Sequence, residues 1–267
     1  MTESNTVPTS PSAPAPATAS DFARLPLSPA ALANLQALGY ERMTPIQAAS
    51  LPLSLAGRDL IAQARTGSGK TAAFTLPLLA NLNPRRFAVQ ALVLCPTREL
   101  ADQVAGEVRR LARAEDNIKV LTLCGGSPVQ PQLVSLSHGA HIVVGTPGRV
   151  LDHLDRASLA LDALATLVLD EADRMLDMGF ADEIKQVLKH CPAQRQTLMF
   201  SATYPEGVQA LATRFMRQPQ TVTIKETHAP EQIRQLFIEV TETQRLHAVS
   251  LLLKHHRPVS TLAFCNT

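Results

Sequence analysis

Short runs of aliphatic residues alternate along the chain with segments whose apolar positions recur at helical spacing. Seven such runs between residues 59 and 224 are short and nearly free of charge, which is typical of buried β-strands. They are DLIAQ (59–63), QALVLC (90–95), KVLTLC (119–124), HIVVGT (141–146), TLVLDE (166–171), QTLMFSA (196–202) and TVTI (221–224).

The segments between these runs are predicted to be amphipathic helices. In residues 98–113, Leu100, Val104, Val108 and Leu111 form one apolar stripe at helical spacing. Continuous apolar strands that alternate with such helices indicate a mostly parallel sheet covered by helices on both faces. The predicted fold class is therefore α/β.

The two ends of the chain break this pattern. Residues 1–20 are almost entirely Pro, Ser, Thr and Ala, with Glu3 as the one charged side chain, so we expect a disordered tail. After residue 226 the alternation restarts, with predicted strands at 235–240 and 261–265 around a helix at 245–256. Residues 227–267 are thus expected to be a linker and the truncated start of a second α/β domain. Its two strands lack most of a sheet, so we expect them to be mobile or exchanged with a neighbour.

Composition narrows the class of protein. The 267 residues are 45% hydrophobic without an apolar run near ~18 residues, which argues against a membrane protein. A net charge of +2 means that any nucleic-acid binding depends on a local basic patch. The four cysteines form no CxxC pair and no secretory signal is visible. We therefore expect buried thiols, a cytoplasmic location and a monomer.

The stretch AQARTGSGKT (62–71) joins a predicted strand to a predicted helix. Gly67 and Gly69 allow the backbone to wrap around a phosphate, Lys70 can reach the β- and γ-phosphates, and the Thr71 hydroxyl suits Mg²⁺. Ala64 stands where the phosphate-loop pattern has its first Gly. A flexible surface turn is the alternative interpretation.

Two adjacent carboxylates, Asp170 and Glu171, follow the strand TLVL. Such a pair is unfavourable at a strand end unless a cation is nearby. With a metal-bound triphosphate, Asp170 could hold Mg²⁺ through its waters and Glu171 could deprotonate the attacking water. A solvated strand end that caps a helix is the alternative.

Several motifs, in order, resemble those of the DEAD-box ATP-dependent RNA helicases. The motifs are ARTGSGKT (64–71), PTREL (96–100), TPGR (146–149), DEAD (170–173) and SAT (201–203). The resemblance covers residues 21–267. In detail, the sequence is most similar to the bacterial DbpA-type subgroup, which acts on large-subunit ribosomal RNA. The resemblance implies a RecA-like P-loop domain over residues 49–226 and the start of a second RecA-like domain, so that this chain alone is expected to be nearly inactive.

The resemblance also implies which residues contact the nucleotide. Residues 21–48 resemble the family's adenine-reading segment, in which Gln47 would pair with the adenine edge, Tyr40 would stack on the ring, and Arg42 would flank it. Tyr40 is equally explained as an aromatic at the edge of the core. Met43 stands where many members of the family have Pro. The full set of implied nucleotide contacts is Phe22, Tyr40, Arg42, Gln47, Ala64, Arg65, Thr66, Gly67, Ser68, Gly69, Lys70 and Thr71.

Coupling and RNA contacts follow from the same resemblance. Asp173, Ser201 and Thr203 would link the nucleotide site to the RNA face. RNA contacts are expected at Pro96, Thr97, Arg98, Gly125, Gly126, Thr146, Pro147, Gly148 and Arg149, all of which follow the ends of predicted strands. The chain has no Trp and two Tyr, so we expect backbone recognition without base stacking. Taken alone, each arginine could equally be a solvated charge at a helix start.

The sequence thus predicts an RNA-stimulated ATPase that uses ATP and Mg²⁺, separates short RNA duplexes and acts on RNA, with ribosomal RNA as one candidate. Two other classes stay open. One is a different P-loop NTPase, such as a DNA translocase or an ATP-driven assembly factor. The other is a non-catalytic RNA-binding clamp, against which intact Lys70, Asp170 and Glu171 already argue.

Overall fold

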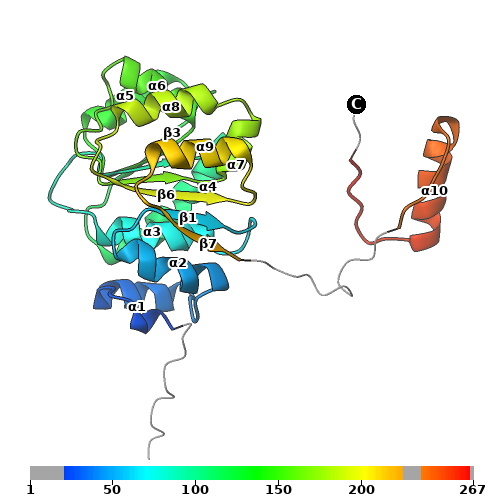
Figure 1. Cartoon of the computed structure of the whole chain (residues 1–267), viewed down its shortest axis with the longest axis horizontal. Coiled ribbons are helices and arrows are strands. Elements are labelled where there is room, and N and C mark those ends of the chain that lie inside the picture. The colour runs from blue at the N-terminus through cyan, green and yellow to red at the C-terminus, as the bar shows by residue number, and fades with distance from the viewer. Residues whose placement is uncertain (1–20, 225–235, 265–267) are drawn as a thin grey trace, which may run out of the picture. The chain divides into compact units, whose positions relative to one another are not determined.

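The computed structural model describes residues 21–224 and 236–264, which fall into two separate units that divide after residue 225 (Figure 1). In the first unit, seven strands form one parallel sheet in the order β3-β4-β2-β5-β6-β1-β7. The strands are β1 (Leu60–Gln63), β2 (Ala91–Leu94), β3 (Val120–Leu123), β4 (Ile142–Gly145), β5 (Thr166–Leu169), β6 (Gln196–Ser201) and β7 (Gln220–Thr223). Each predicted strand of this unit is present, and the α/β prediction is confirmed.

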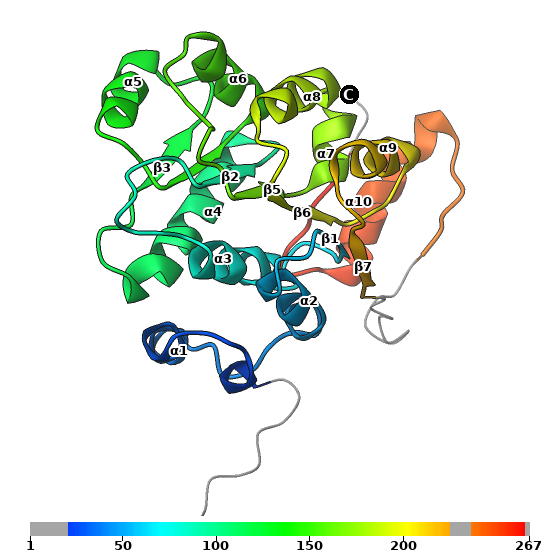
Figure 2. The ribbon, with the colours of Figure 1, turned by 60° about the vertical axis from the view of Figure 1, so that its left-hand side comes forward.

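Helices cover both faces of the sheet (Figure 2). One face packs against α5, α6, α7, α8 and α9, and the other against α2, α3 and α4. The helices of the first unit are α1 (Pro29–Ala37), α2 (Pro45–Leu55), α3 (Lys70–Ala80), α4 (Arg98–Leu111), α5 (Val129–Ser137), α6 (Pro147–Asp155), α7 (Ala172–Asp177), α8 (Ala181–His190) and α9 (Glu206–Phe215), with short 3-10 turns at Phe22–Arg24 and Ala112–Ala114.

Strand side chains alternate between the two covered faces, which explains why the runs are mostly apolar. On β2, Leu92 and Leu94 join the core under α6 to α9, whereas Ala91 and Val93 join the core under α3 and α4. On α4, the predicted stripe residues Leu100, Val104 and Val108 pack in the second of these cores, whereas Leu111 packs in a third apolar cluster. Cys95, Cys124 and Cys191 are buried free thiols, while Cys265 lies outside the described residues.

A third apolar cluster attaches the segment before the sheet. Phe22, Leu35 and Met43 pack with Leu51 of α2 and Leu76 of α3. This cluster holds residues 21–44 against the outer side of the helices that flank β1. It thereby places the segment that follows α1 close to the β1–α3 loop.

The described part of the second unit differs from the prediction. The predicted helix is present as α10 (Arg245–His256), preceded by a 3-10 turn at Glu242–Gln244. Residues 236–240 and 261–264 form no strand, so the prediction of strands there is wrong for the described residues. A strand needs a paired neighbour, and these residues have none in this unit; Phe237, for example, is 93% exposed. Residues 1–20 and the 225–235 stretch lie outside the described residues.

No helix in the described part of the chain is long and apolar enough to cross a membrane.

Candidate functional site

The parallel sheet brings the carboxyl ends of its strands to one edge, and the predicted site residues lie there. The β1 end leads into the phosphate-loop candidate, and the β5 end leads into Asp170 and Glu171. The β6 end lies directly beside β1, where the Ala64 amide donates to the carbonyl of Ser201 at 3.0 Å. Residues distant in sequence are therefore neighbours because β1 is inserted between β6 and β7.

The β1–α3 loop has the backbone shape that its glycines allow. Gly67 and Gly69 have φ values of 83° and 92°, a region that side chains disfavour. At Gly69, a Cβ atom would also lie 2.6 Å from the Nε2 atom of Gln47. Ser68 donates to the carbonyl of Arg65 at 2.8 Å, and helix α3 begins at Lys70. The loop therefore has a defined shape with contacts at both of its ends, while Arg65, Thr66 and Gly67 are exposed.

Lys70 carries the strongest single indication of a ligand. Its side chain is buried, 6% exposed, and its Nζ atom has no hydrogen-bond partner in the described structure. A buried ammonium without a partner is costly unless an anion neutralises it. It lies at the first turn of α3, where free backbone N–H groups add positive potential. A cavity of about 430 Å³ opens beside it, lined also by Thr66, Thr71, Asp170 and Glu171.

The two carboxylates are buried, not solvated, so the capped and solvated strand end is contradicted. Asp170 and Glu171 are 4% and 8% exposed, and Glu171 provides no side-chain cap to α7 although it occupies the N-cap position. Glu171 has φ 50°, a strained value for a residue with a side chain. Its carboxylate accepts from the Thr66 hydroxyl at 3.0 Å and from the Arg174 guanidinium at 3.1 Å.

The environment of the cavity disfavours the ionised form of Asp170. Burial raises the pKa of Asp170 to about 6; the positive charge of Lys70 opposes this rise, and the negative charge of Glu171 adds to it. A carboxylate that is costly to ionise here becomes favourable when a cation arrives. Among the described residues, no cluster of three or more His, Cys, Asp or Glu side chains could hold a metal. Such a site suits a cation that takes most of its ligands from phosphates and water.

Asp173 connects the β5 and β6 ends. Its carboxylate accepts from the backbone N–H and the hydroxyl of Thr203, at 2.8 and 2.7 Å. Its own backbone N–H donates to the hydroxyl of Ser201 at 3.2 Å. Burial raises the pKa of Asp173, but these hydrogen bonds outweigh it and the pKa is lowered. The structure therefore brings into contact Asp173, Ser201 and Thr203, the three residues predicted to link the nucleotide site to the RNA face.

A second, open hollow of about 390 Å³ adjoins the phosphate-loop candidate. Its lining includes Tyr40, Arg42, Thr44, Gln47 and Gly69. The Gln47 amide donates to the carbonyl of Gly69 at 3.0 Å and accepts from the backbone N–H of Thr44 at 2.9 Å. One amide hydrogen and one oxygen lone pair remain for a ligand. Phe22 does not line the hollow but contacts the Tyr40 ring from behind, edge to face, with ring centroids 6.2 Å apart.

Tyr40 also contacts helix α4. Its hydroxyl donates to Glu107 at 2.5 Å, and Glu107 is paired with Arg110 at 2.8 Å. Burial, with the hydrogen bond to Glu107, raises the pKa of Tyr40. The tyrosine is thus held between a core cluster and a polar anchor. Sequence periodicity could not predict this, because Glu107 reads as one more charge on the outer face of α4.

Three further strand ends supply the residues predicted to contact RNA. Pro96, Thr97 and Arg98 follow β2, where Thr97 caps α4 by accepting from the backbone N–H of Leu100 at 3.2 Å. The Arg98 side chain is 51% exposed and ion-paired with Glu99 at 3.4 Å. A Cβ atom at Gly126 would lie 3.1 Å from the Arg98 guanidinium, so the β2 and β3 ends meet. Gly125 is open on its outer side.

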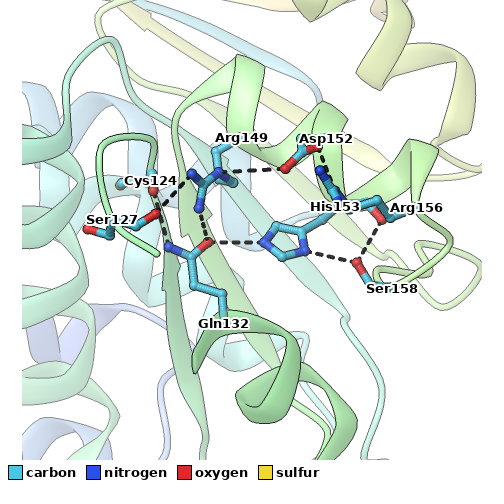
Figure 3. Close-up of polar contacts among 8 residues, drawn as sticks. All are labelled: Cys124, Ser127, Gln132, Arg149, Asp152, His153, Arg156 and Ser158. Atoms are coloured by element: carbon cyan, nitrogen blue, oxygen red, sulfur yellow. Dashed lines mark hydrogen bonds and ion pairs between the residues drawn. The ribbon is translucent and has the colours of Figure 1, made fainter. Parts of the chain in front are cut away.

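The third set, residues 146–149, follows β4 and forms the start of α6. Thr146 is the N-cap residue, Pro147 occupies the first turn, and Gly148 has open space where a side chain would begin. In contrast to Arg98, Arg149 is only 14% exposed. Its guanidinium donates to Gln132 and to the carbonyl of Ser127, at 3.0 and 3.1 Å (Figure 3).

Comparison with known proteins decides the family. A model of the DEAD/DEAH box helicase family matches residues 44–211. The chain belongs to the DEAD/DEAH box helicase family. The match runs from the segment that contains Gln47 through the β1–α3 loop and the carboxylate pair to α9.

Individual members of the helicase family agree with this assignment. The chain is 56% identical over 241 residues to the ATP-dependent RNA helicase DbpA of Escherichia coli (strain K12), and 44% identical over 248 residues to the DEAD-box ATP-dependent RNA helicase CshA of Geobacillus kaustophilus. These alignments cover 90% and 92% of this chain and 53% of each relative, so the chain spans about half the length of these relatives.

A solved helicase structure confirms the predicted RecA-like fold. The crystal structure of a DEAD box protein from the hyperthermophile Methanococcus jannaschii superposes with a TM-score of 0.74 at 40% identity. The superposition covers 88% of this chain and 63% of that one. The expected resemblance to DEAD-box helicases, including the DbpA type, is therefore confirmed.

Some side chains of the candidate site are not identified by the sequence patterns. Arg174 pairs with Glu171 across one helical turn, and its spacing of three residues was the available signal. Gln132 and His153 lie beside Arg149, and no motif or periodicity marks them. Gln132 lies on α5 and His153 on α6, so their contact depends on how these two helices pack together.

The raised pKa of Asp170 predicts how the stability of the ligand-free helicase domain depends on pH. Because the folded-state pKa lies above the unfolded value of 3.8, the folded protein holds the proton more tightly. This contribution is fully present below about pH 4 and is lost as the pH rises through 6. Asp170→Asn should therefore be more stable than wild type at pH 7, by on the order of a few kcal/mol, and the gap should shrink at acidic pH.

Urea unfolding of both proteins between pH 4 and 8 measures this gap. Asp173→Asn is the matched control, because the lowered pKa of Asp173 predicts the opposite sign, a loss of stability at neutral pH. A gap for Asp170→Asn that stays constant across the range would contradict the burial-driven shift.

Proposed function

We propose that this chain is the ATP-binding part of an ATP-dependent RNA helicase whose ATP hydrolysis is stimulated by RNA. The observation that carries the proposal is the buried Lys70 ammonium without a partner, at the start of α3 and beside two buried carboxylates. The names of the two curated relatives, both ATP-dependent RNA helicases, support the same conclusion.

The residues around Lys70 fit the phosphates of ATP. The ammonium would neutralise the β- and γ-phosphates, and the first backbone N–H groups of α3 would donate to their oxygens. The space that a side chain at Gly69 would occupy is taken by Gln47 and Thr44, so this position must be glycine for the loop to keep its shape. Arg65, Thr66 and Ser68 complete the loop.

The same cavity fits Mg²⁺. Thr71 and Asp170 both line it and would hold the ion, Thr71 by its hydroxyl and Asp170 directly or through water. Bound there, Mg²⁺ would neutralise phosphate charge and so favour the ionised form of Asp170.

Glu171 is the proposed general base. Its carboxylate faces the cavity, where it would accept the proton of a water that attacks the γ-phosphorus in line with the leaving oxygen. Thr66 and Arg174, which each bond one of its oxygens, would fix its orientation. The strained backbone of Glu171 is consistent with this role, because strain of this kind gathers at functional positions.

The open hollow beside Gly69 is the proposed adenine site. Gln47 keeps one donor and one acceptor for the base edge, and Tyr40 and Arg42 lie on the wall. Guanine presents the reverse pattern at that edge, so the site would prefer ATP. Phe22 would act indirectly, by supporting the Tyr40 ring.

RNA would bind along the strand ends that carry Arg98, Gly125, Gly126 and the residues 146–149. Arg98 supplies an exposed charge, and the first turns of α4 and α6 supply backbone N–H groups for phosphate oxygens. Such contacts read the backbone, not the base sequence. Asp173, Ser201 and Thr203 would relay changes between this face and the nucleotide. Ribosomal RNA is the proposed target class, and strand separation would require a second domain.

Lys70→Ala tests the phosphate site. Removal of the ammonium should weaken binding of a fluorescent ATP analogue by more than about tenfold, because charge-assisted bonds to two phosphates are lost. Lys185→Ala, which removes an exposed lysine paired with Asp182, is the control and should bind like wild type. An unchanged dissociation constant for Lys70→Ala would exclude the assignment of the loop.

Glu171→Gln separates binding from chemistry. The amide keeps the size of the side chain but loses its basicity, so nucleotide binding should persist while RNA-stimulated hydrolysis falls by about two orders of magnitude or more. The assay uses the protein with its second helicase domain, single-stranded RNA, and DNA of the same sequence. Glu206→Gln, an exposed change on α9, is the control. Equal hydrolysis in Glu171→Gln removes the base assignment, and stimulation by DNA as strong as by RNA indicates a translocase.

Nucleotide competition tests the adenine site. GTP should displace a bound fluorescent ATP analogue poorly, and Gln47→Ala should reduce this discrimination because both base-reading atoms are lost. Gln36→Ala, at an exposed position of α1, should leave it unchanged. Equal displacement by GTP and ATP in wild type would leave the hollow without its proposed ligand.

A further inference from the structure

A partly buried polar network, in which His153 and Cys124 are the buried members, lies beside the proposed RNA face, and its centre is the half-buried Gln132 of α5 (Figure 3). The Gln132 amide nitrogen donates to the carbonyl of Cys124 at 3.1 Å, at the end of β3. Its oxygen accepts from Arg149 of α6 at 3.0 Å and lies 3.0 Å from the Nε2 atom of His153. One side chain therefore joins the β3 end, α5 and α6.

The partners fix which way the amide points. Arginine can only donate, so the atom beside Arg149 is the amide oxygen, and the nitrogen faces the Cys124 carbonyl. The Nε2 atom of His153 must then carry a proton toward that oxygen. Burial lowers the pKa of His153, which favours the neutral ring, and the Nδ1 atom lies 2.8 Å from the hydroxyl of Ser158. Two donors thus hold the Gln132 oxygen in place.

The network also restrains Arg149. One terminal nitrogen donates to Gln132, the other donates to the carbonyl of Ser127 at 3.1 Å, and the Nε atom lies 3.8 Å from Asp152. These contacts use only part of the five N–H donors of a guanidinium. The remaining donors are held in one orientation, so less side-chain entropy would be lost when a phosphate binds.

Helix α5 has little else to hold it at this position. It contains no fully buried residue, although Leu136 packs in part against the core. The loop that it follows, residues 124–127, carries the two exposed glycines of the proposed RNA face. The amide of Gln132 is therefore well placed to set both the loop and Arg149.

We propose that Gln132 is a positioning residue for RNA binding, acting through Arg149 without touching the RNA. The inference rests on the proposed function, because it assumes that this face binds an RNA backbone. It adds a side chain that lies outside the motifs predicted from the sequence.

The test measures binding of a fluorescein-labelled single-stranded RNA to the 267-residue chain at low salt by anisotropy. Gln132→Leu, which keeps the side-chain volume but removes all three hydrogen bonds, should bind about five- to tenfold more weakly. Gln130→Leu is the matched control on the same helix, since its side chain is exposed and unbonded in the described structure, and it should bind like wild type. Equal binding by Gln132→Leu and Gln130→Leu overturns the proposal.

A double-variant cycle separates positioning from a general structural role. If Gln132 acts through Arg149, Gln132→Leu should hardly weaken RNA binding further when Arg149→Lys is already present. In an Arg98→Ala background, the same substitution should weaken RNA binding by its full factor of about five- to tenfold. An equal loss in both backgrounds overturns the proposal, because it shows that the effect does not pass through Arg149. If Gln132→Leu lowers the melting temperature, Gln132→Met, an unbranched and good helix former, replaces it in the same cycle.

The wild-type titration keeps the two hypotheses apart. Failure of wild type to bind the RNA at any concentration overturns the proposed RNA face and this inference with it. If wild type binds the RNA, Arg98→Ala binds it more weakly and Gln132→Leu binds it equally well, the proposed function stands and this inference alone is overturned.

Discussion

Parallel pairing of the strands is the constraint on which the site depends. In a parallel sheet every strand delivers its carboxyl end to the same edge, and each return crossing needs a helix. The β1, β2, β3, β4, β5 and β6 ends therefore carry the phosphate-loop candidate, the three proposed RNA segments, the carboxylate pair and the Ser201–Thr203 turn to one edge. The sheet can supply this edge because helices cover both of its faces and its central strands bury mostly apolar side chains.

The residues at this edge of the sheet lower the stability of the folded chain. The edge holds a buried ammonium without a partner, a buried carboxyl with a raised pKa, and a glutamate with a strained backbone. Each of these features opposes folding when the site is empty. Well-packed apolar clusters elsewhere offset the cost, as is common where a functional site and stability compete.

Sequence patterns were informative where one property repeats or where a motif has a chemical cause. The apolar runs predicted every strand of the first unit, and the GSGKT and DEAD segments predicted which strand ends carry the cavity. The sequence patterns were not informative where the structure depends on contacts with residues distant in the sequence. Residues 236–240 have the composition of a strand, but no strand among the described residues pairs with them. Gln132, His153 and Glu107 matter through contacts made by packing, and nothing local distinguishes them from other polar residues.

Helix α4 has a further consequence. Its first residue is Arg98 at the proposed RNA face, and its tenth is Glu107, which accepts a hydrogen bond from the Tyr40 hydroxyl beside the proposed adenine site. A helix of 14 residues is a stiff rod about 21 Å long. A small tilt of that rod that relaxes the Tyr40 contact must also displace Arg98. The Tyr40 contact and the position of Arg98 are therefore tied to one helix, which the buried Val104 and Val108 hold against the sheet.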